Sequence, residues 1–250
     1  MEHTRHAMIL AAGLGSRLAA DEGHKILAQV GGRPLIDYHI NNFARLGVSD
    51  LTVVTGYRHE ALAETLENWP LPEGMRLHVA FNPNFQGRNG ISVLAGVDAV
   101  CGGEPFWLTM GDHIIEPGLF DDLAERFEAE RQAHWQGSLM IDYKLDTIFD
   151  MPDANKLYLE QGGLTIGKDI YGFSAIDVGL FWCGRGFVQA LRAEFDRRGD
   201  CDTSDAVSAL HAQKAFWLWD IGERQWQDVD TAGAREHAEK LIAAWRASER

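Results

Sequence analysis

The feature that most constrains the fold is the alternation, through the first half of the chain, of short apolar runs with amphipathic helical stretches. This alternation is typical of parallel strands in the middle of a sheet with helices on both faces. The sequence therefore predicts an α/β fold with a doubly wound, mostly parallel, Rossmann-like sheet. The expected strands, rich in Val, Ile, Leu and aromatic residues, are 7–10, 51–55, 77–81, 106–110 and 138–143.

Helices are expected between these strands, and the second half of the chain has a different pattern. The first-half helices are 34–46, which Gly47 ends, and 117–132, which opens on Pro117. Residues 156–160 and 164–167 flank the turn Gln161-Gly162-Gly163 and predict a β-hairpin insertion. Further elements are expected as a strand at 175–182, helices at 187–197 and 204–213, a strand at 216–220 and a terminal helix from about 232. We expect one nucleotidyltransferase domain over 1–250, with a nucleotide-binding half at 1–145 and an acceptor-binding half with C-terminal helices at 146–250.

The charge of the chain favours a small-molecule substrate. The formal net charge is -14, so the surface should repel nucleic acid and anionic membranes. Its three cysteines form no CxxC pair, which gives no support to a zinc site or a disulfide framework. The apolar stretch 7–12 is too short for a signal peptide or a membrane span, so a cytoplasmic protein is expected.

A glycine-rich loop follows the first expected strand. Residues 10–18 read LAAGLGSRL, and a loop at the carboxyl end of a strand in an open sheet is where ligands bind. Small residues let backbone N–H groups approach phosphate oxygens, and Arg17 adds a cationic fork. A dinucleotide fingerprint would need glycine where Leu18 stands, and no GK[ST] follows for a Walker loop. A plain strand-to-helix turn is the alternative for such a short motif.

This opening resembles the signature of the sugar-phosphate nucleotidyltransferase superfamily, which is GT-A-like: L-A-A-G-x-G-x-R-L, a short loop and then P-K. Here His24 replaces the proline before Lys25, a departure that affects the substrate assignment more than the reaction. Later segments are similar to the inositol-1-phosphate cytidylyltransferase branch, namely VTGY at 54–57, RNGIS at 88–92, MGDH at 110–113, IGKD at 166–169, IDVG at 176–179 and DVDT at 228–231.

The resemblance implies roles for the opening loop. Arg17 and Lys25 would grip the triphosphate as catalytic residues. The nucleotide would be bound by the small residues of the loop, which are Leu10, Ala11, Ala12, Gly13, Gly15 and Ser16.

Two aspartates are candidate Mg²⁺ ligands. Asp112 ends an apolar strand at the same sheet edge as the glycine loop. Asp228 and Asp230 alternate along a strand, so only one of them should face the site, and the resemblance selects Asp230. Two carboxylates on one Mg²⁺ suit a site where phosphates supply the other ligands. Helix capping is the alternative role for both aspartates.

The segment 88–92 is expected to bind the base. The Asn89 amide offers donors and an acceptor that suit the edge of cytosine, Gly90 would let a ring pack against backbone, and Ser92 is a further contact. A helix start at Asn89 is the alternative, and both can hold together.

For the acceptor phosphate the strongest candidate is Lys156, with Lys168 a weaker one, and a solvated surface lysine is the alternative. Asp142 and Asp177 would bind hydroxyls of a polyol, unless they are solvent-facing positions of their strands.

Together these features predict a Mg²⁺-dependent transfer of CMP from CTP to a small phosphorylated alcohol, similar to inositol-1-phosphate, that yields a CDP-alcohol and pyrophosphate. Alternatives with the same chemistry are a phosphocholine or phosphonate cytidylyltransferase, or a sugar-1-phosphate enzyme that uses another NTP. A nucleotide-sensing protein without turnover is an alternative from another class. Exposed strand edges in the hairpin region would support a homodimer.

Overall fold

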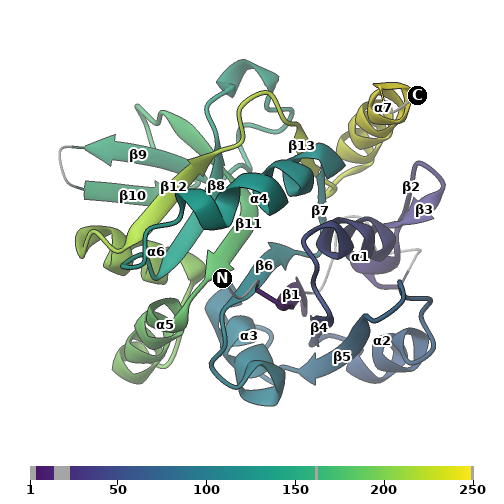
Figure 1. The fold of residues 1–250 in the computed structure, drawn as a ribbon, viewed down its shortest axis with the longest axis horizontal. Coiled ribbons are helices and arrows are strands. Elements are labelled where there is room, and N and C mark those ends of the chain that lie inside the picture. The colour runs from purple at the N-terminus through teal and green to yellow at the C-terminus, as the bar shows by residue number, and fades with distance from the viewer. Residues whose placement is uncertain (1–3, 14–22, 161–162, 249–250) are drawn as a thin grey trace.

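A nine-stranded sheet runs through the protein, with helices on both of its faces (Figure 1). The computed structural model describes residues 4–13, 23–160 and 163–248. It confirms the predicted α/β fold. The strands of the sheet are β1 (His6–Ala11), β4 (Asp50–Thr55), β5 (Arg76–Phe81), β6 (Phe106–Met110), β8 (Gly137–Asp142), β9 (Lys156–Glu160), β10 (Gly163–Gly167), β11 (Ala175–Cys183) and β12 (Phe216–Asp220).

The first half of the sheet is parallel. Strand β1 lies between β4 and β6 and pairs in parallel with both, and β4 pairs in parallel with β5. These strands therefore end at one edge of the sheet, where a doubly wound fold binds its ligands. The β9–β10 hairpin is antiparallel, as the sequence predicts.

The sheet is split beside strand β11, because β11 pairs with different neighbours along its length. Along one edge it pairs with β8. Along the other edge it pairs with β9 through Ala175 and Ile176, and with β6 from Leu180 to Cys183. Residues 177–179 of β11 thus pair with neither β6 nor β9, and the β8 ladder is irregular over the same stretch. The split lies beside the end of β6.

The helices divide between the two faces of the sheet. The helices are α1 (Leu35–Arg45), α2 (His59–Leu66), α3 (Asn89–Gly96), α4 (Pro117–Glu130), α5 (Arg185–Arg198), α6 (Thr203–Ala212) and α7 (Ala232–Ser248). Hydrophobic residues of α1, α2 and α4 pack in one buried cluster, and those of α3, α5 and α6 pack in another on the opposite face. None of the helices in the described ranges is both long enough and apolar enough to span a membrane.

A third buried cluster supports two small sheets, of which the sequence indicates only a strand near Asp228. Strands β7 (His113–Ile115) and β13 (Trp226–Asp228) form one antiparallel pair, and β2 (Gln29–Val30) and β3 (Arg33–Pro34) form the other. Helix α7 contacts β13 and β2 and covers this region (Figure 1). Both small sheets are too short to show a hydrophobic period in the sequence.

The buried carboxylate of Asp50 anchors the start of β4, and it leads to a testable pH dependence. It accepts two hydrogen bonds of 2.8 Å from the Arg76 guanidinium, one of 2.9 Å from Ser49 and one of 3.1 Å from His78. Burial alone would raise the pKa of Asp50, but these partners outweigh it and lower the pKa to about 2.

We therefore expect Asp50→Asn to lower the free energy of unfolding by about 2 kcal/mol at neutral pH. Because the pKa of Asp50 is lowered by folding, its contribution is present above the unfolded value of 3.8 and is lost as the pH falls toward about 2. Urea titrations at several pH values measure this. The gap between wild type and variant should shrink below pH ~4, and an equal gap at acidic and neutral pH would contradict the assignment.

Candidate active site

A cavity of about 390 Å³ lies where the sheet splits. Its walls come from the end of β1, the turn after β6, the unpaired stretch of β11, and the chain around β13. Leu10, Ala11, Ala12 and Gly13 line it, as expected for the first part of the glycine-rich loop. Gly15, Ser16 and Arg17 lie outside the described residues.

The Lys25 ammonium lies between the two predicted metal ligands. It donates a 2.8 Å hydrogen bond to Asp112 Oδ2 and forms an ion pair with Asp230 Oδ1. Lys25 opens a short 3₁₀ helix, Asp112 follows β6, and Asp230 follows β13, so three distant segments meet at this point. The two carboxylates converge on a single position for a cation.

The donor set at this position fits a hard divalent cation that keeps other oxygen ligands. Over the described ranges no group of three or more His, Cys, Asp or Glu side chains forms a ready-made metal site. The protein would therefore supply two carboxylates, and phosphate or water oxygens would complete the shell, as is usual for Mg²⁺. Burial would raise the pKa of Asp112, but His113 and Lys25 outweigh it, so the pKa is lowered and the carboxylate is ionised.

A chain of contacts fixes the orientation of Asp112. His113 Nδ1 lies 2.7 Å from Asp112 Oδ1, and the His113 ring is stacked on Trp226 with a centroid separation of 5.6 Å and an angle of 7°. Trp226 Nε1 in turn donates a 3.0 Å hydrogen bond to Asp142 Oδ2. Asp142 Oδ1 also accepts from the Lys144 ammonium at 2.8 Å. Asp142, expected to bind a polyol, does not line the cavity and instead holds Trp226 in place.

Three carboxylates surround His113. Burial disfavours its imidazolium, but the hydrogen bond that it donates to Asp112 and the negative charges of Asp112, Asp228 and Asp177 outweigh it, so the pKa of His113 is raised. Asp177 lines the cavity, and burial raises its pKa to about 6 although the Gly179 amide donates to it at 2.7 Å. The cavity thus has an acidic wall in addition to the backbone at 10–13.

The expectation that only one of Asp228 and Asp230 faces the site is wrong. Both line the cavity. Strand β13 ends at Asp228, and the next amide, Val229 N–H, donates to the Asp112 carbonyl at 2.8 Å. Because the extended strand does not continue to Asp230, the alternation of side chains does not apply there.

At the expected base-binding edge the polar groups already have protein partners. Asn89 and Ser92 line the cavity. Asn89 Oδ1 accepts from the Thr203 amide at 2.9 Å, and Asn89 Nδ2 donates to Thr203 Oγ1 at 3.2 Å. Ser92 Oγ accepts from Asn82 at 2.8 Å. Gly90 does not line the cavity and faces the backbone of Cys201.

Of the two candidate lysines for the acceptor, the structure places Lys168 on the cavity wall but not Lys156. The buried Lys156 ammonium donates to three carbonyl oxygens, those of Lys168 at 2.7 Å, Ala154 at 3.2 Å and Pro152 at 3.4 Å. Lys168 is half exposed, with its ammonium 3.4 Å from Asp153 Oδ1. Lys156 thus organises the loop that presents Lys168.

The first half of the chain identifies the family to which the chain belongs. The MobA-like NTP transferase domain matches residues 7–138, which include the glycine-rich loop, Lys25 and Asp112. The chain belongs to this family. Membership places it among nucleotidyltransferases, in agreement with the resemblance found in the sequence.

Two relatives of this NTP transferase match over nearly its whole length. A bifunctional IPC transferase and DIPP synthase of Rubrobacter xylanophilus is 28% identical over 97% of this chain and 53% of its own length. A CMP-5'-(3-aminopropyl)phosphonate synthase of Streptomyces rubellomurinus is 26% identical over 98% of this chain and 40% of its own. The chain therefore spans about half the length of these curated relatives, or less.

The fold of this NTP transferase is also found among solved structures. The inositol-1-phosphate CTP transferase from T. maritima superposes with a TM-score of 0.78, covering 98% of this chain and 97% of that one. The sequences are 21% identical, so the likeness shows the fold.

The sequence does not point to several residues that line the cavity of this NTP transferase. Among them are Thr203, Trp226 and Asp153. All three come from the second half of the chain and follow turns whose direction no local pattern fixes. The sequence gives a partial signal for Trp226, since it lies two residues before Asp228 in the segment that resembles the family pattern.

Gly179 is required by the close approach of His113. Its φ is +74°, and a Cβ there would lie 2.7 Å from His113 Cδ2. We expect Gly179→Ala to destabilise the protein by roughly 1–3 kcal/mol, because the backbone would be strained and the ring displaced. Pyrophosphate release should fall as well, since His113 orients Asp112. Thermal unfolding and activity measure both effects.

Gly163→Ala is the matched control, because a Cβ there has no atom within 4 Å and its φ is not in the left-handed region. Equal stability and activity for the two alanine variants would contradict the packing role of Gly179.

Proposed function

We propose that this chain is a Mg²⁺-dependent cytidylyltransferase, which transfers CMP from CTP to the phosphate of a small phosphorylated alcohol such as inositol-1-phosphate. The products are a CDP-alcohol and pyrophosphate. The observation that carries the proposal is the convergence of Asp112 and Asp230 on the Lys25 ammonium, beside the glycine-rich loop. The names of the relatives support a cytidylyl transfer.

The reaction brings two anions together, so cations and positioning are the main requirements. Asp112 and Asp230 would hold Mg²⁺, which when bound neutralises charge on the triphosphate. In that state Lys25 would be available to pair with the phosphates and, with Arg17, would stabilise the charge of the departing pyrophosphate. The backbone at 10–13 approaches the nucleotide because its side chains are small.

Lys168 is our candidate for holding the acceptor phosphate. It lies on the cavity wall formed by the second half of the chain, and its ammonium is half exposed. A positive charge there lets the acceptor oxygen approach the α-phosphorus in line with the leaving pyrophosphate. The transfer needs no covalent nucleophile from the protein.

A phosphonate or phosphate acceptor that carries an amine is the second candidate. Three aspartates, Asp153, Asp177 and Asp228, line the cavity and would stabilise an ammonium group. One relative is named for an aminopropylphosphonate product. Asp177 serves either candidate, because a carboxylate accepts from a hydroxyl as well as from an ammonium.

The test is a matrix of four NTPs against a set of acceptors, scored by pyrophosphate release with Mg²⁺ or EDTA. The acceptors are inositol-1-phosphate, glucose-1-phosphate, phosphocholine and 2-aminoethylphosphonate. We expect release with CTP, and with inositol-1-phosphate in preference to the others. Preference for the amine-bearing acceptors would select the second candidate, and preference for another NTP would contradict the cytidylyl assignment. Nucleotide binding without release under any acceptor would indicate a sensor.

A further inference from the structure

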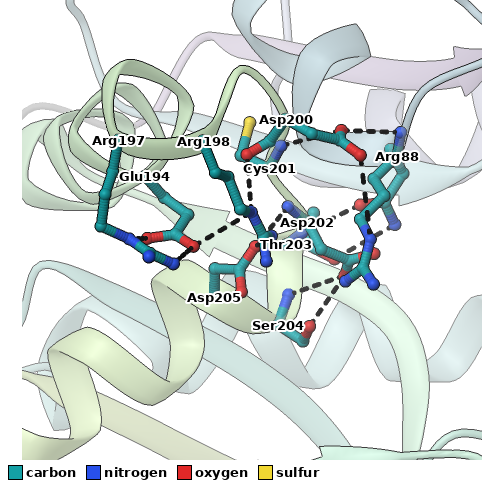
Figure 2. Close-up of polar contacts among 11 residues, drawn as sticks. Arg88, Glu194, Arg197, Arg198, Asp200, Cys201, Asp202, Thr203, Ser204 and Asp205 are labelled. Carbon is teal, nitrogen blue, oxygen red and sulfur yellow. Dashed lines mark hydrogen bonds and ion pairs between the residues drawn. The ribbon is translucent and has the colours of Figure 1, made fainter.

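The loop between α5 and α6 packs against the start of α3, although 112 residues separate Asp200 from Arg88 (Figure 2). The contact is tight. A Cβ on Gly90 would lie 2.6 Å from the Cys201 carbonyl oxygen, so only glycine fits at the second position of α3. The close approach of the Cys201 turn, which comes from the other half of the chain, therefore explains why position 90 is a glycine.

Asp200 joins the two segments through its carboxylate. One oxygen, Oδ1, accepts from the Arg88 amide at 3.0 Å and from the Cys201 amide at 2.9 Å. Helix α3 has no cap from the side chain of its own N-cap residue, Arg88. The Arg88 guanidinium adds an ion pair of 3.9 Å to the other Asp200 oxygen. Asp200 thus fixes the backbone just before α3 and the start of the Cys201 turn together.

The second connection reaches the cavity. Asn89 and Thr203 both line it and exchange the two hydrogen bonds described above. Thr203 is buried. The side chains at this edge of the cavity are therefore held by a contact between the two halves of the chain, and the position of α3 depends on the position of the loop.

Contacts with residues of α5 and α6 hold the loop in place (Figure 2). Arg198 Nε donates to the Asp200 carbonyl at 2.9 Å, and its guanidinium pairs with Asp205 and with Glu194. Asp202 caps α6 and accepts from the Ser204 amide at 3.0 Å. The loop is thus a defined support that can transmit its position to α3.

We infer that Asp200 is a positioning residue for nucleobase recognition, acting through Arg88 and the Asn89–Thr203 pair. This rests on the proposed function, in which the start of α3 meets the base. The metal carboxylates follow β6 and β13 and do not depend on this loop. Loss of Asp200 should therefore affect nucleotide selection more than the chemical step.

The experiment compares Asp200→Ala, Asp200→Asn and Arg197→Ala by steady-state kinetics with CTP, UTP and inositol-1-phosphate, after thermal unfolding has shown that each is folded. Asp200→Ala leaves two amides unpaired, so we expect the KM for CTP to rise about tenfold and the CTP to UTP preference to fall. The kcat and the KM for the acceptor should stay within about twofold, because these depend on the metal site.

Asp200→Asn retains an oxygen that can accept both amides and should restore the KM for CTP. Arg197 contacts Glu194 on the outer side of the network, so Arg197→Ala should match wild type (Figure 2). If Asp200→Ala does not fold, Thr203→Val decides the matter, since it removes the hydroxyl partner of Asn89 and should raise the KM for CTP.

Folded Asp200→Ala with an unchanged KM for CTP and unchanged CTP to UTP preference would overturn the inference, as would an equal loss in kcat and in the KM for both substrates. An unchanged KM in Thr203→Val would overturn it too. Wild-type protein that neither binds CTP in equilibrium dialysis nor releases pyrophosphate would overturn the proposed function instead.

Discussion

Asp112→Asn and Asp230→Asn should each reduce Mg²⁺-dependent pyrophosphate release by about a hundredfold or more. Both carboxylates meet at one cation position, and asparagine keeps the size of the side chain while it removes the charge. Turnover at saturating CTP and acceptor, over a range of Mg²⁺ concentrations, measures the effect. Circular dichroism and thermal unfolding should show that both variants are folded.

Asp121→Asn is the control for these two variants. The Asp121 side chain is 55% exposed and pairs with Arg45 away from the cavity. Its replacement should leave turnover within about twofold of wild type, since exposed ion pairs contribute little. Near-normal turnover in both Asp112→Asn and Asp230→Asn would refute the metal assignment and, with it, the mechanism.

Lys25→Ala should lower kcat/KM for CTP by about a hundredfold and yet bind Mn²⁺ more tightly when no nucleotide is present. The two effects have opposite signs for one reason. The ammonium of Lys25 neutralises Asp112 and Asp230, so a divalent cation must compete with it. Once the nucleotide is bound, the same charge should stabilise the phosphates, as the proposed function requires. Electron paramagnetic resonance of free Mn²⁺ measures the first effect, and steady-state kinetics measures the second.

Lys240→Ala, a change to an exposed lysine on α7, should alter neither quantity. Weaker Mn²⁺ binding by Lys25→Ala would contradict the competition, because removal of a positive charge should favour the metal. Unchanged kcat/KM would contradict a role for Lys25 toward the triphosphate.

The main elements of the fold could be predicted because their patterns are local and long enough to read. The strand expected at 106–110 is β6, and the hairpin strand expected at 156–160 is β9, with the same bounds. The two small sheets could not be found, since a strand as short as β7 has three residues and shows no period. The pairing of β11 with its three neighbours, β6, β8 and β9, could not be predicted either, because it depends on the arrangement of the whole sheet.

The site was predictable where a residue ends a strand and less so where it lies on a turn. Asp112 follows β6, so the topology alone brings it to the glycine-rich loop. Lys156 and Asp142 are polar and suited to a ligand, but both are buried with protein partners. A buried polar group needs a hydrogen-bond partner, but the sequence does not show which partner it has. The roles of Asn89 and Thr203 depend on a contact between distant segments.

Strand β11 has a consequence for how the substrates meet. It runs without interruption past the split, and its hydrogen bonds tie the β6 side of the cavity to the β9 side. The two walls are therefore parts of one sheet, and separating them as hinged lobes would require β11 to bend or break at residues 177–179. In the function proposed above, the spacing of the donor and acceptor phosphates would then be set when the chain folds, and their alignment would not require domain closure.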